Sequence, residues 1–170
     1  MQLVEFGALS VREWIDLTGR EREAFGAQSA GVVWHAKERH VGLREPGGRL
    51  AAVAGATTAD VEVDGAGAFP VVGLGGLIIR KDLRGQGLMP ALMDALARLA
   101  ESMGPDRAMI FCESHLIELY QRRGYSLIPD PVWVDQPDGR IEMPVAALWR
   151  PLRPAPPWPS GRVDLRTLPF

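Results

Sequence analysis

The segment Arg84-Gly85-Gln86-Gly87-Leu88-Met89 lies between two stretches of sequence whose apolar patterns differ. Before it, residues 71–79 form a long apolar run with β-branched residues and glycines, which predicts a buried strand. After it, leucine recurs at positions 88, 92, 96 and 99, which predicts the apolar face of a helix. Because glycine tolerates positive φ, the two glycines permit a tight turn between them. The sequence therefore predicts a strand, a glycine turn and a helix in succession.

This turn is a candidate phosphate site. The first amides of a helix lack intrahelical partners and the helix dipole is positive at that end, so an anion is stabilised there. A Walker loop requires Gly-Lys-Ser/Thr, which this segment lacks, and a dinucleotide fingerprint requires glycine where Pro90 stands. The alternative is an ordinary strand-to-helix turn in which the glycines serve geometry alone.

Composition limits the class of protein. The chain has 170 residues, of which 46% are hydrophobic and 24% charged, as expected for one globular domain. Its net charge of −2 does not favour a nucleic-acid partner. The single cysteine, Cys112, excludes an internal disulfide and fits a reducing compartment. With no signal-like start and no apolar run long enough to span a bilayer, we expect a cytoplasmic protein with no membrane partner.

The pattern of the chain predicts alternating strands and helices. Ser10 and Glu13 have the spacing of a capping box, which starts a helix whose Trp14 and Leu17 are expected to face the core. Residues 21–35 are expected to be helical or irregular, and residues 39–80 to form an antiparallel meander. The remaining predictions are helices over 87–103 and 115–123, and strands over 3–8, 108–112, 125–128 and 141–149. The strand before the glycine turn, the helix over 87–103 and the strand over 108–112 form a βαβ unit whose two strands must pair in parallel. Together the elements give a mixed α/β fold, with a mostly antiparallel sheet of about seven strands and helices on both faces.

Residues 151–170 differ in character from the rest. Five prolines lie between positions 151 and 159, which favours an extended conformation, and apolar residues return after position 160. We expect residues 1–150 to form a single domain and 151–170 a proline-rich tail on or beside it. Two interpretations of the tail stay open: it packs across the surface, or it covers an acceptor cleft or a dimer partner.

A second motif lies further along the chain, as Leu119-Tyr120-Gln121-Arg122-Arg123-Gly124-Tyr125. It resembles the Leu-Tyr-x-x-x-Gly-(Phe/Tyr) segment of the GNAT acyltransferase superfamily. Arg84 and Gly87 likewise resemble the Arg-x-x-Gly-x-(Gly/Ala) acetyl-CoA signature of these proteins, although Met89 stands where glycine or alanine is usual. The two motifs have the family's order and spacing. Residues 71–128 are therefore similar to the central part of a GNAT acyltransferase, and the order of strands agrees to about residue 149.

The resemblance implies acetyl-CoA as co-substrate. Its pyrophosphate would bind the turn of Arg84, Gly85, Gln86, Gly87, Leu88 and Met89, and its pantetheine arm would pair with the strand at Leu77, Ile78 and Ile79. The glycines at 73, 75 and 76 suit a bulge that opens the sheet there. Arg80 and Lys81 either add positive charge near the phosphates or lie at a solvated strand end, and we favour the second interpretation.

The resemblance also implies N-acetyl transfer to a primary amine, carried by a small molecule or by a protein N-terminus or lysine. Tyr120 matches the family's general acid, which protonates the departing thiolate; alternatively it is a core aromatic residue. Gly75 stands where many relatives have a glutamate base. Glu113 is our other catalytic candidate, as base or amine ligand, although it could instead cap the helix near His115. The three histidines lack metal-ligand spacing, so no metal is expected.

The sequence leaves two further interpretations of the function open. Trp158 and Asp164 in the tail give a weak similarity to aminoglycoside 2′-N-acetyltransferases, since acidic residues suit a polycationic sugar. Gly75 and Met89, as departures from the family pattern, favour a non-catalytic acyl-CoA-binding or interaction module. Dimerisation is common in the superfamily, so a homodimer is a further expectation.

Overall fold

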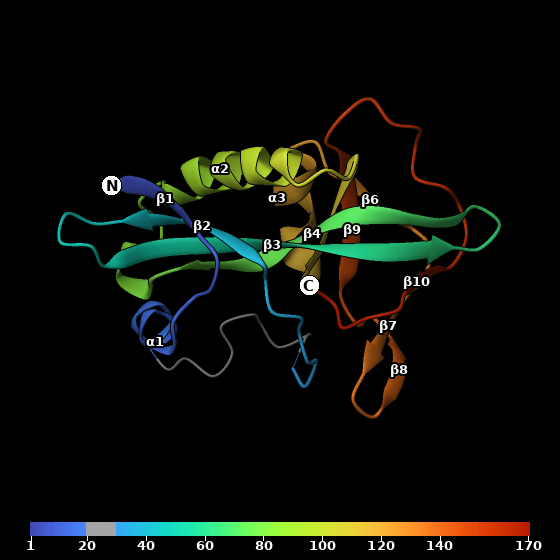
Figure 1. Cartoon of the computed structure of the whole chain (residues 1–170), viewed down its shortest axis with the longest axis horizontal. Coiled ribbons are helices and arrows are strands. Elements are labelled where there is room, and N and C mark those ends of the chain that lie inside the picture. Colours follow the sequence, from blue (N-terminus) through green and yellow to red (C-terminus); the bar gives the residue numbers. More distant parts are fainter. Residues whose placement is uncertain (20–29) are drawn as a thin grey trace.

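The computed structural model describes residues 1–19 and 30–170, and Figure 1 shows how their elements are arranged. Two short 3₁₀ turns, η1 (Lys81–Leu83) and η2 (Ser114–Leu116), accompany three helices, which are α1 (Val11–Thr18), α2 (Leu88–Ser102) and α3 (Ile117–Gln121). The strands are β1 (Gln2–Phe6), β2 (Arg39–Arg44), β3 (Leu50–Val63), β4 (Gly67–Ile79), β5 (Arg107–Cys112), β6 (Ser126–Leu127), β7 (Val132–Gln136), β8 (Gly139–Glu142), β9 (Ala146–Pro151) and β10 (Val163–Leu165). None of the helices in this described part is long and apolar enough to cross a bilayer.

All of these strands belong to one mixed sheet. Its order is β6-β9-β5-β4-β3-β10-β7-β8. The β1–β2 pair joins β3 through β2, on the same edge as β10 but at the other end of the strand. The pairing of β4 with β5 is parallel, while β2, β3 and β4 form an antiparallel meander, so both predicted arrangements are confirmed. The expected count of about seven strands was too low, because the described part of the chain forms a ten-stranded sheet.

Helices cover both faces of this sheet, as predicted (Figure 1). Leu92 and Leu96 of α2 pack on one face, in the same cluster as Tyr120 of α3. Leu17 of α1 packs on the opposite face, against Val53 and other apolar residues. Successive residues of a strand point to opposite faces, so β3 supplies both clusters with side chains.

The predicted capping box at the start of α1 is present. The Ser10 hydroxyl accepts the Glu13 amide at 3.2 Å, and a Glu13 carboxylate oxygen accepts the Ser10 amide at 3.1 Å. Leu17 is buried as expected, but the expectation that Trp14 faces the core was wrong, since 38% of Trp14 is exposed. The reason is that α1 has only eight residues and buries only its last turn, at Leu17 and Thr18.

The C-terminal third departs most from the predicted elements. The strand predicted over 141–149 is two strands, β8 and β9, which are separated by residues 143–145 with Pro144 at their centre. Proline cannot donate to a strand ladder, which accounts for the break. Sequence patterns also missed β7 and β10. The three residues of β10 lie between β3, antiparallel, and β7, parallel. The prediction for residues 21–35 falls largely outside the described residues.

The sheet opens where the glycines predicted a bulge. Val53 of β3 pairs with Ile78, but Gly55 pairs with Gly75, so β4 holds the larger number of residues between these pairs, and Gly76 has a φ of 61°. On its other side, β4 pairs with β5 only from Val72 to Leu74, although β4 continues to Ile79. The last five residues of β4 therefore separate from β5.

We predict that Ser10→Ala lowers the free energy of unfolding by about 1 kcal/mol at neutral pH, the usual cost of losing an N-cap side chain. The Ser10 hydroxyl and then Arg44 lower the pKa of Glu13 to about 2 in the folded protein, below its value of about 4.3 in an unfolded chain. Because the pKa of Glu13 is depressed in the folded protein, the stability that comes from the bond between the Ser10 hydroxyl and the Glu13 carboxylate is complete above about pH 5. This stability is lost as pH falls toward 2.

Denaturant unfolding of the wild type and Ser10→Ala across this pH range tests the prediction, with the exposed neighbour Arg12→Ala as control. A difference between wild type and Ser10→Ala that stays constant down to about pH 2 would contradict the assignment.

Candidate active site

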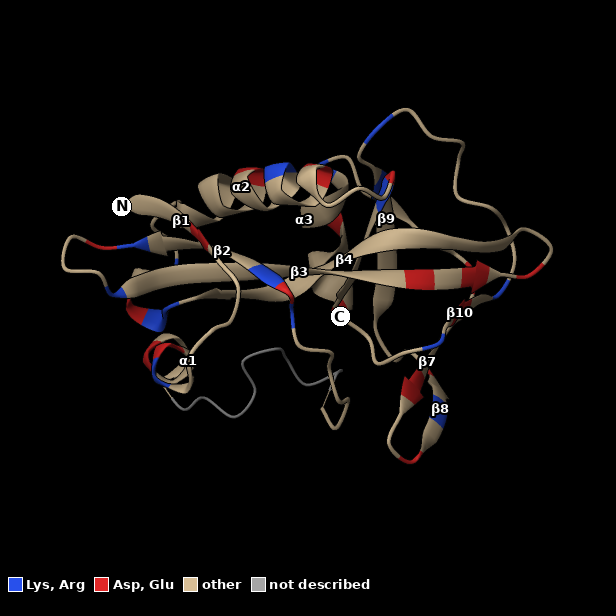
Figure 2. Ribbon diagram, viewed as in Figure 1, with Lys and Arg blue, Asp and Glu red and all other residues tan. Residues whose placement is uncertain are grey.

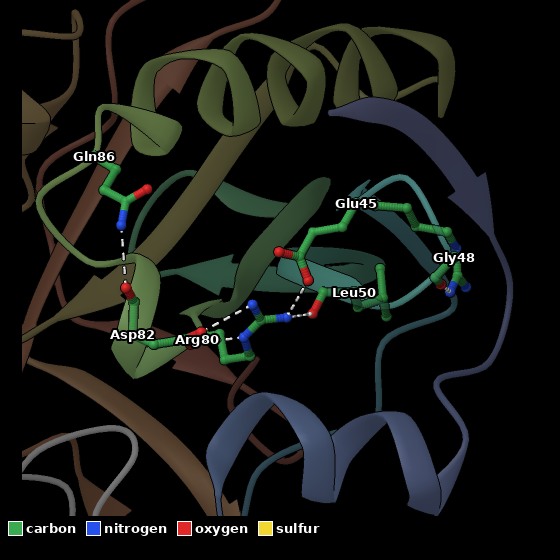
Figure 3. Close-up of polar contacts among 7 residues, drawn as sticks. Glu45, Gly48, Leu50, Arg80, Asp82 and Gln86 are labelled. Atoms are coloured by element: carbon green, nitrogen blue, oxygen red, sulfur yellow. Dashed lines mark hydrogen bonds and ion pairs between the residues drawn. The ribbon is translucent and has the colours of Figure 1, made fainter.

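The glycine turn is anchored by a buried arginine (Figure 3). Arg80 is 6% exposed; its guanidinium donates to Asp82 and Glu45 at 2.6 Å each and to the Leu50 carbonyl at 3.2 Å. The Gln86 side chain donates to the Asp82 carbonyl at 3.1 Å. Arg80 therefore ties the end of β4 to the β2–β3 turn, and it does not point its charge toward a phosphate. This differs from both interpretations made from the sequence, since Arg80 is neither free nor solvated.

The turn itself is open. Gly85 and Gly87 have φ values of 78° and 76°, and a β-carbon on either would meet no atom within 4 Å. No side chain of the described residues caps the start of α2, where Gly87 is the N-cap. Met89, the departure from the acetyl-CoA signature, packs against the core cluster of α2. Its side chain is thus accommodated by the core, and the exposed turn leaves backbone amides and space for an anion.

A large cavity begins where β4 separates from β5. Its volume is about 690 Å³, and it is lined by Gly75, Gly76 and Leu77 on the β4 side and by Ile110, Phe111 and Cys112 on the β5 side. Of the three residues predicted to pair with a pantetheine arm, Leu77 lines this cavity, while Ile78 is buried toward α1 and Ile79 packs on the α2 cluster. Their shared backbone forms the unpaired edge of β4.

Both predicted catalytic residues line this cavity. Tyr120 comes from α3 and is 5% exposed. Burial raises the pKa of its phenol above the usual value, so the hydroxyl keeps its proton at neutral pH. Burial likewise raises the pKa of the nearby Cys112 thiol to about 11, which leaves the thiol neutral and a poor nucleophile.

Glu113 follows directly after β5 and lines the same cavity as Tyr120. It occupies the N-cap position of η2, but its side chain makes no capping hydrogen bond there. One carboxylate oxygen lies 3.4 Å from Nδ1 of His115, and the side chain is 15% exposed. The helix-capping alternative therefore lacks its defining hydrogen bond, and the carboxylate shares a cavity with the Tyr120 hydroxyl.

The space beside Gly75 is occupied by other parts of the chain. A β-carbon on Gly75 would lie 3.2 Å from Cε of Lys37 and 3.0 Å from the backbone carbon of Phe170. These contacts are tighter than ordinary packing, so any side chain at this position would require Phe170 and Lys37 to shift. The structure thus gives a physical reason for the departure from the family pattern, since the tail and Lys37 fill the position of the missing side chain.

Sequence patterns missed several cavity residues. Lys37, Trp34 and His40 belong to or precede β2, and Phe170 belongs to the tail; all four line the cavity. The tail is held there because the His35 amide donates to the Pro169 carbonyl at 2.7 Å. No local motif marks these residues, because each reaches the cavity only through long-range packing. Apolar residues after position 160 were the one available signal for the tail.

The acidic residues that suggested an aminoglycoside lie elsewhere. Asp164 is ion-paired with Arg140 and Arg162, and Asp135 lies 3.1 Å from Arg140. Figure 2 shows acidic positions on β7 and at the end of β3, away from α1. These carboxylates do not line the large cavity in the described part of the chain.

This geometry agrees with the sequence model of the Acetyltransferase (GNAT) family, which matches residues 8–125. The match spans well over half of the chain, and the chain belongs to this family of acetyltransferases. Among curated protein sequences, none matches this chain.

Solved structures of GNAT proteins share the fold. A GNAT family N-acetyltransferase (YhbS) from Escherichia coli, solved in complex with CoA, is 18% identical with a TM-score of 0.61, and the alignment covers 96% of this chain and 89% of that chain. The ribosomal-protein-S18-alanine N-acetyltransferase from Escherichia coli is also 18% identical, with a TM-score of 0.55 and coverage of 94% and 99%. An aminoglycoside 6′-N-acetyltransferase complexed with coenzyme A is 15% identical, with a TM-score of 0.58 and coverage of 92% and 99%.

We predict that Gly73→Ala destabilises the protein by about 1–3 kcal/mol, the usual range for overpacking a core. A β-carbon at Gly73 would lie 2.2 Å from Cγ of the Phe170 ring, which is itself 2% exposed. The ring must therefore move.

Unfolding measurements on Gly73→Ala, Phe170→Ala and the double variant form a double-mutant cycle. Since Phe170→Ala removes the clash, the double variant should lose less stability than the two single variants together. Strictly additive losses would show that the ring does not occupy this position.

Proposed function

We propose that this protein is an acetyl-CoA-dependent N-acetyltransferase that transfers an acetyl group directly to a primary amine. The observation that carries the proposal is the single cavity that brings Tyr120 and Glu113 to the unpaired edge of β4. The exposed glycine turn at the start of α2 follows directly in the chain, through η1. The proposed phosphate site thus follows the open strand edge along the chain, and the proposed proton donor lines the cavity at that edge.

The residues present fit acetyl-CoA. The turn of residues 84–89 offers amides at an uncapped helix start, with glycines that leave the space above them empty. On the side of β4 that faces away from β3, the backbone at Leu77–Ile79 has no strand partner among the described residues, and an amide-bearing pantetheine arm supplies one. The Ile79 carbonyl already accepts a hydrogen bond from Nε of Arg84 at 3.1 Å. The thioester would then lie in the cavity beside Tyr120. Two solved structures that share this fold contain coenzyme A.

The chemistry follows from these positions. The neutral amine nitrogen attacks the thioester carbon, a C–N bond forms, and the C–S bond breaks to release the thiolate. Tyr120 donates its proton to the departing sulfur, and its raised pKa ensures that it holds the proton until then. Glu113 binds the ammonium form of the acceptor and takes up the first proton, which leaves before the amine attacks. The second N–H proton, which leaves as the amide forms, restores the Tyr120 hydroxyl, so that one proton is released overall. With Cys112 neutral, no acyl-enzyme is required.

Tyr120→Phe is expected to lower kcat roughly 10²-fold while the Kd for acetyl-CoA stays unchanged, because only the proton donor is lost. Tyr125→Phe is the matched control. Its ring is equally buried and contacts the Tyr120 ring at 5.7 Å between centroids, but it does not line the cavity. Steady-state kinetics and calorimetry measure both variants. Equal kcat values for Tyr120→Phe and wild type, when chemistry limits the rate, would refute the assignment.

Gly87→Val is expected to weaken acetyl-CoA binding roughly tenfold or more, since a branched side chain fills the space above the α2 amides. Gly65→Val provides the control: Gly65 has nearly the same φ, 78° against 76°, and equally open surroundings, but lies in the β3–β4 turn. Both variants should lose similar stability.

Calorimetry with acetyl-CoA separates the two variants and tests the proposal as a whole. Equal affinities for both would remove the turn from the binding site. Binding without turnover of any amine would instead favour the acyl-CoA-binding module.

A further inference from the structure

The acceptor end of the cavity has an aromatic wall. Trp34, Phe111 and Phe170 follow one another, with ring centroids 6.3 Å apart for the first pair and 5.3 Å for the second. Trp14 of α1 adds a fourth aromatic side chain to the lining. These four residues come from four separate segments of the chain. A wall of this kind favours a flat apolar body over a hydrated sugar, because aromatic surface recovers little when it contacts polar groups.

A cation lies in the same cavity. The Lys37 side chain passes Gly55 and Gly75, and its ammonium donates to the His35 carbonyl at 3.0 Å. Burial lowers the pKa of Lys37 to about 8, so the ammonium is still mostly charged at neutral pH. Burial is also the largest cause that lowers the pKa of His40, which is therefore mainly neutral. Among the described residues that line the cavity, Glu113 provides the one carboxylate side chain.

The Glu113 carboxylate and the Lys37 ammonium together favour an acceptor with one ammonium group. Glu113 can pair with a single acceptor ammonium. A second positive charge would be desolvated near Lys37, and the described residues that line the cavity offer no further carboxylate side chain to receive it. Two like charges close together in a cavity repel each other, so the Lys37 ammonium weakens the binding of acceptors that carry two positive charges. The acidic residues of β7 and β10, which could have received further ammonium groups, are paired with arginines outside the cavity.

We propose that the acceptor is a monocationic arylalkylamine, whose ring lies against Trp14, Trp34, Phe111 and Phe170, and that Lys37 excludes amines with a second positive charge. This inference rests on the proposed function, and it names the substrate class of that site.

The acceptors that test it form matched pairs. Phenethylamine and ethylamine differ by the ring, and phenethylamine and its para-aminomethyl derivative differ by a second ammonium. With acetyl-CoA and the full chain, kcat/KM for phenethylamine should exceed that of each partner by roughly tenfold or more. Kanamycin and spermidine, both polycations, should be poor acceptors.

Variants assign each preference to its residue. Lys37→Met should narrow the preference for phenethylamine over the para-aminomethyl derivative, and Lys37→Arg, which keeps the charge, should retain it. Trp14→Ala should narrow the preference for phenethylamine over ethylamine. Ile15→Ala, in the same helix and 39% exposed against 38% for Trp14, should leave it unchanged. An unchanged Kd for acetyl-CoA shows that a variant is folded.

The possible outcomes distinguish a failure of the proposed acceptor class from a failure of the proposed acetyltransferase function. Efficient acetylation of kanamycin or spermidine with no turnover of phenethylamine would overturn the substrate class and leave the acetyltransferase intact. A Lys37→Met variant that loses activity equally on both members of the charged pair would overturn the role of Lys37. If acetyl-CoA binds but no amine is acetylated, the proposed function fails, and the inference fails with it.

Discussion

The separation of β4 from β5 beyond Leu74 and Ile110 is the constraint on which the rest of the structure depends. Two parallel strands that continued side by side would close the sheet and leave no cavity. The bulge around Gly76 turns β4 away, so that the end of β4 keeps its pairing with β3 but, within the described part of the chain, has no strand partner on the side that faced β5. Arg80 fixes the end of this diverging strand to the β2–β3 turn, so the start of α2 is held in place. An open edge can then persist in a sheet that is otherwise paired.

The cavity is shaped by small residues in the sheet and large residues that cover them. Gly73 and Gly75 leave hollows on β4, which the Phe170 ring and the Lys37 side chain fill. The sheet therefore gives the position of the cavity, while segments outside the sheet determine its chemistry. This division agrees with a family in which one fold serves many acceptors, since the covering segments can vary without altering the strand edge.

Local patterns were enough to predict the meander, the parallel β4–β5 pair, the capping box at Ser10 and the glycine turn. Each of these depends on residues close in sequence or on a strict apolar period. The missed features depend on distant partners. β10 has three residues, one of them Asp164, whose burial is tolerated only because Arg140 and Arg162 pair with it. Trp14 fits a helical apolar face, yet the short α1 leaves it at the cavity mouth. Lys37 looks like an ordinary surface lysine until Gly55 and Gly75 are placed beside it.

Strand β10 has a consequence for how the molecule opens. In the order of the sheet, β7 and β8 are joined to β3 through the three residues of β10. Val132 and Val134 of β7 and Phe170 of the tail also pack in one buried cluster with residues of β3 and β5, so release of the β7–β8 hairpin and the tail requires loss of this packing together with the ladder bonds of β10. We expect β7, β8 and the tail to open together, as a unit smaller than the whole domain, while β2–β5 and α2 stay paired. Of the aromatic wall, Phe170 belongs to this part, whereas Phe111 on β5 and the glycine turn belong to the part that stays paired.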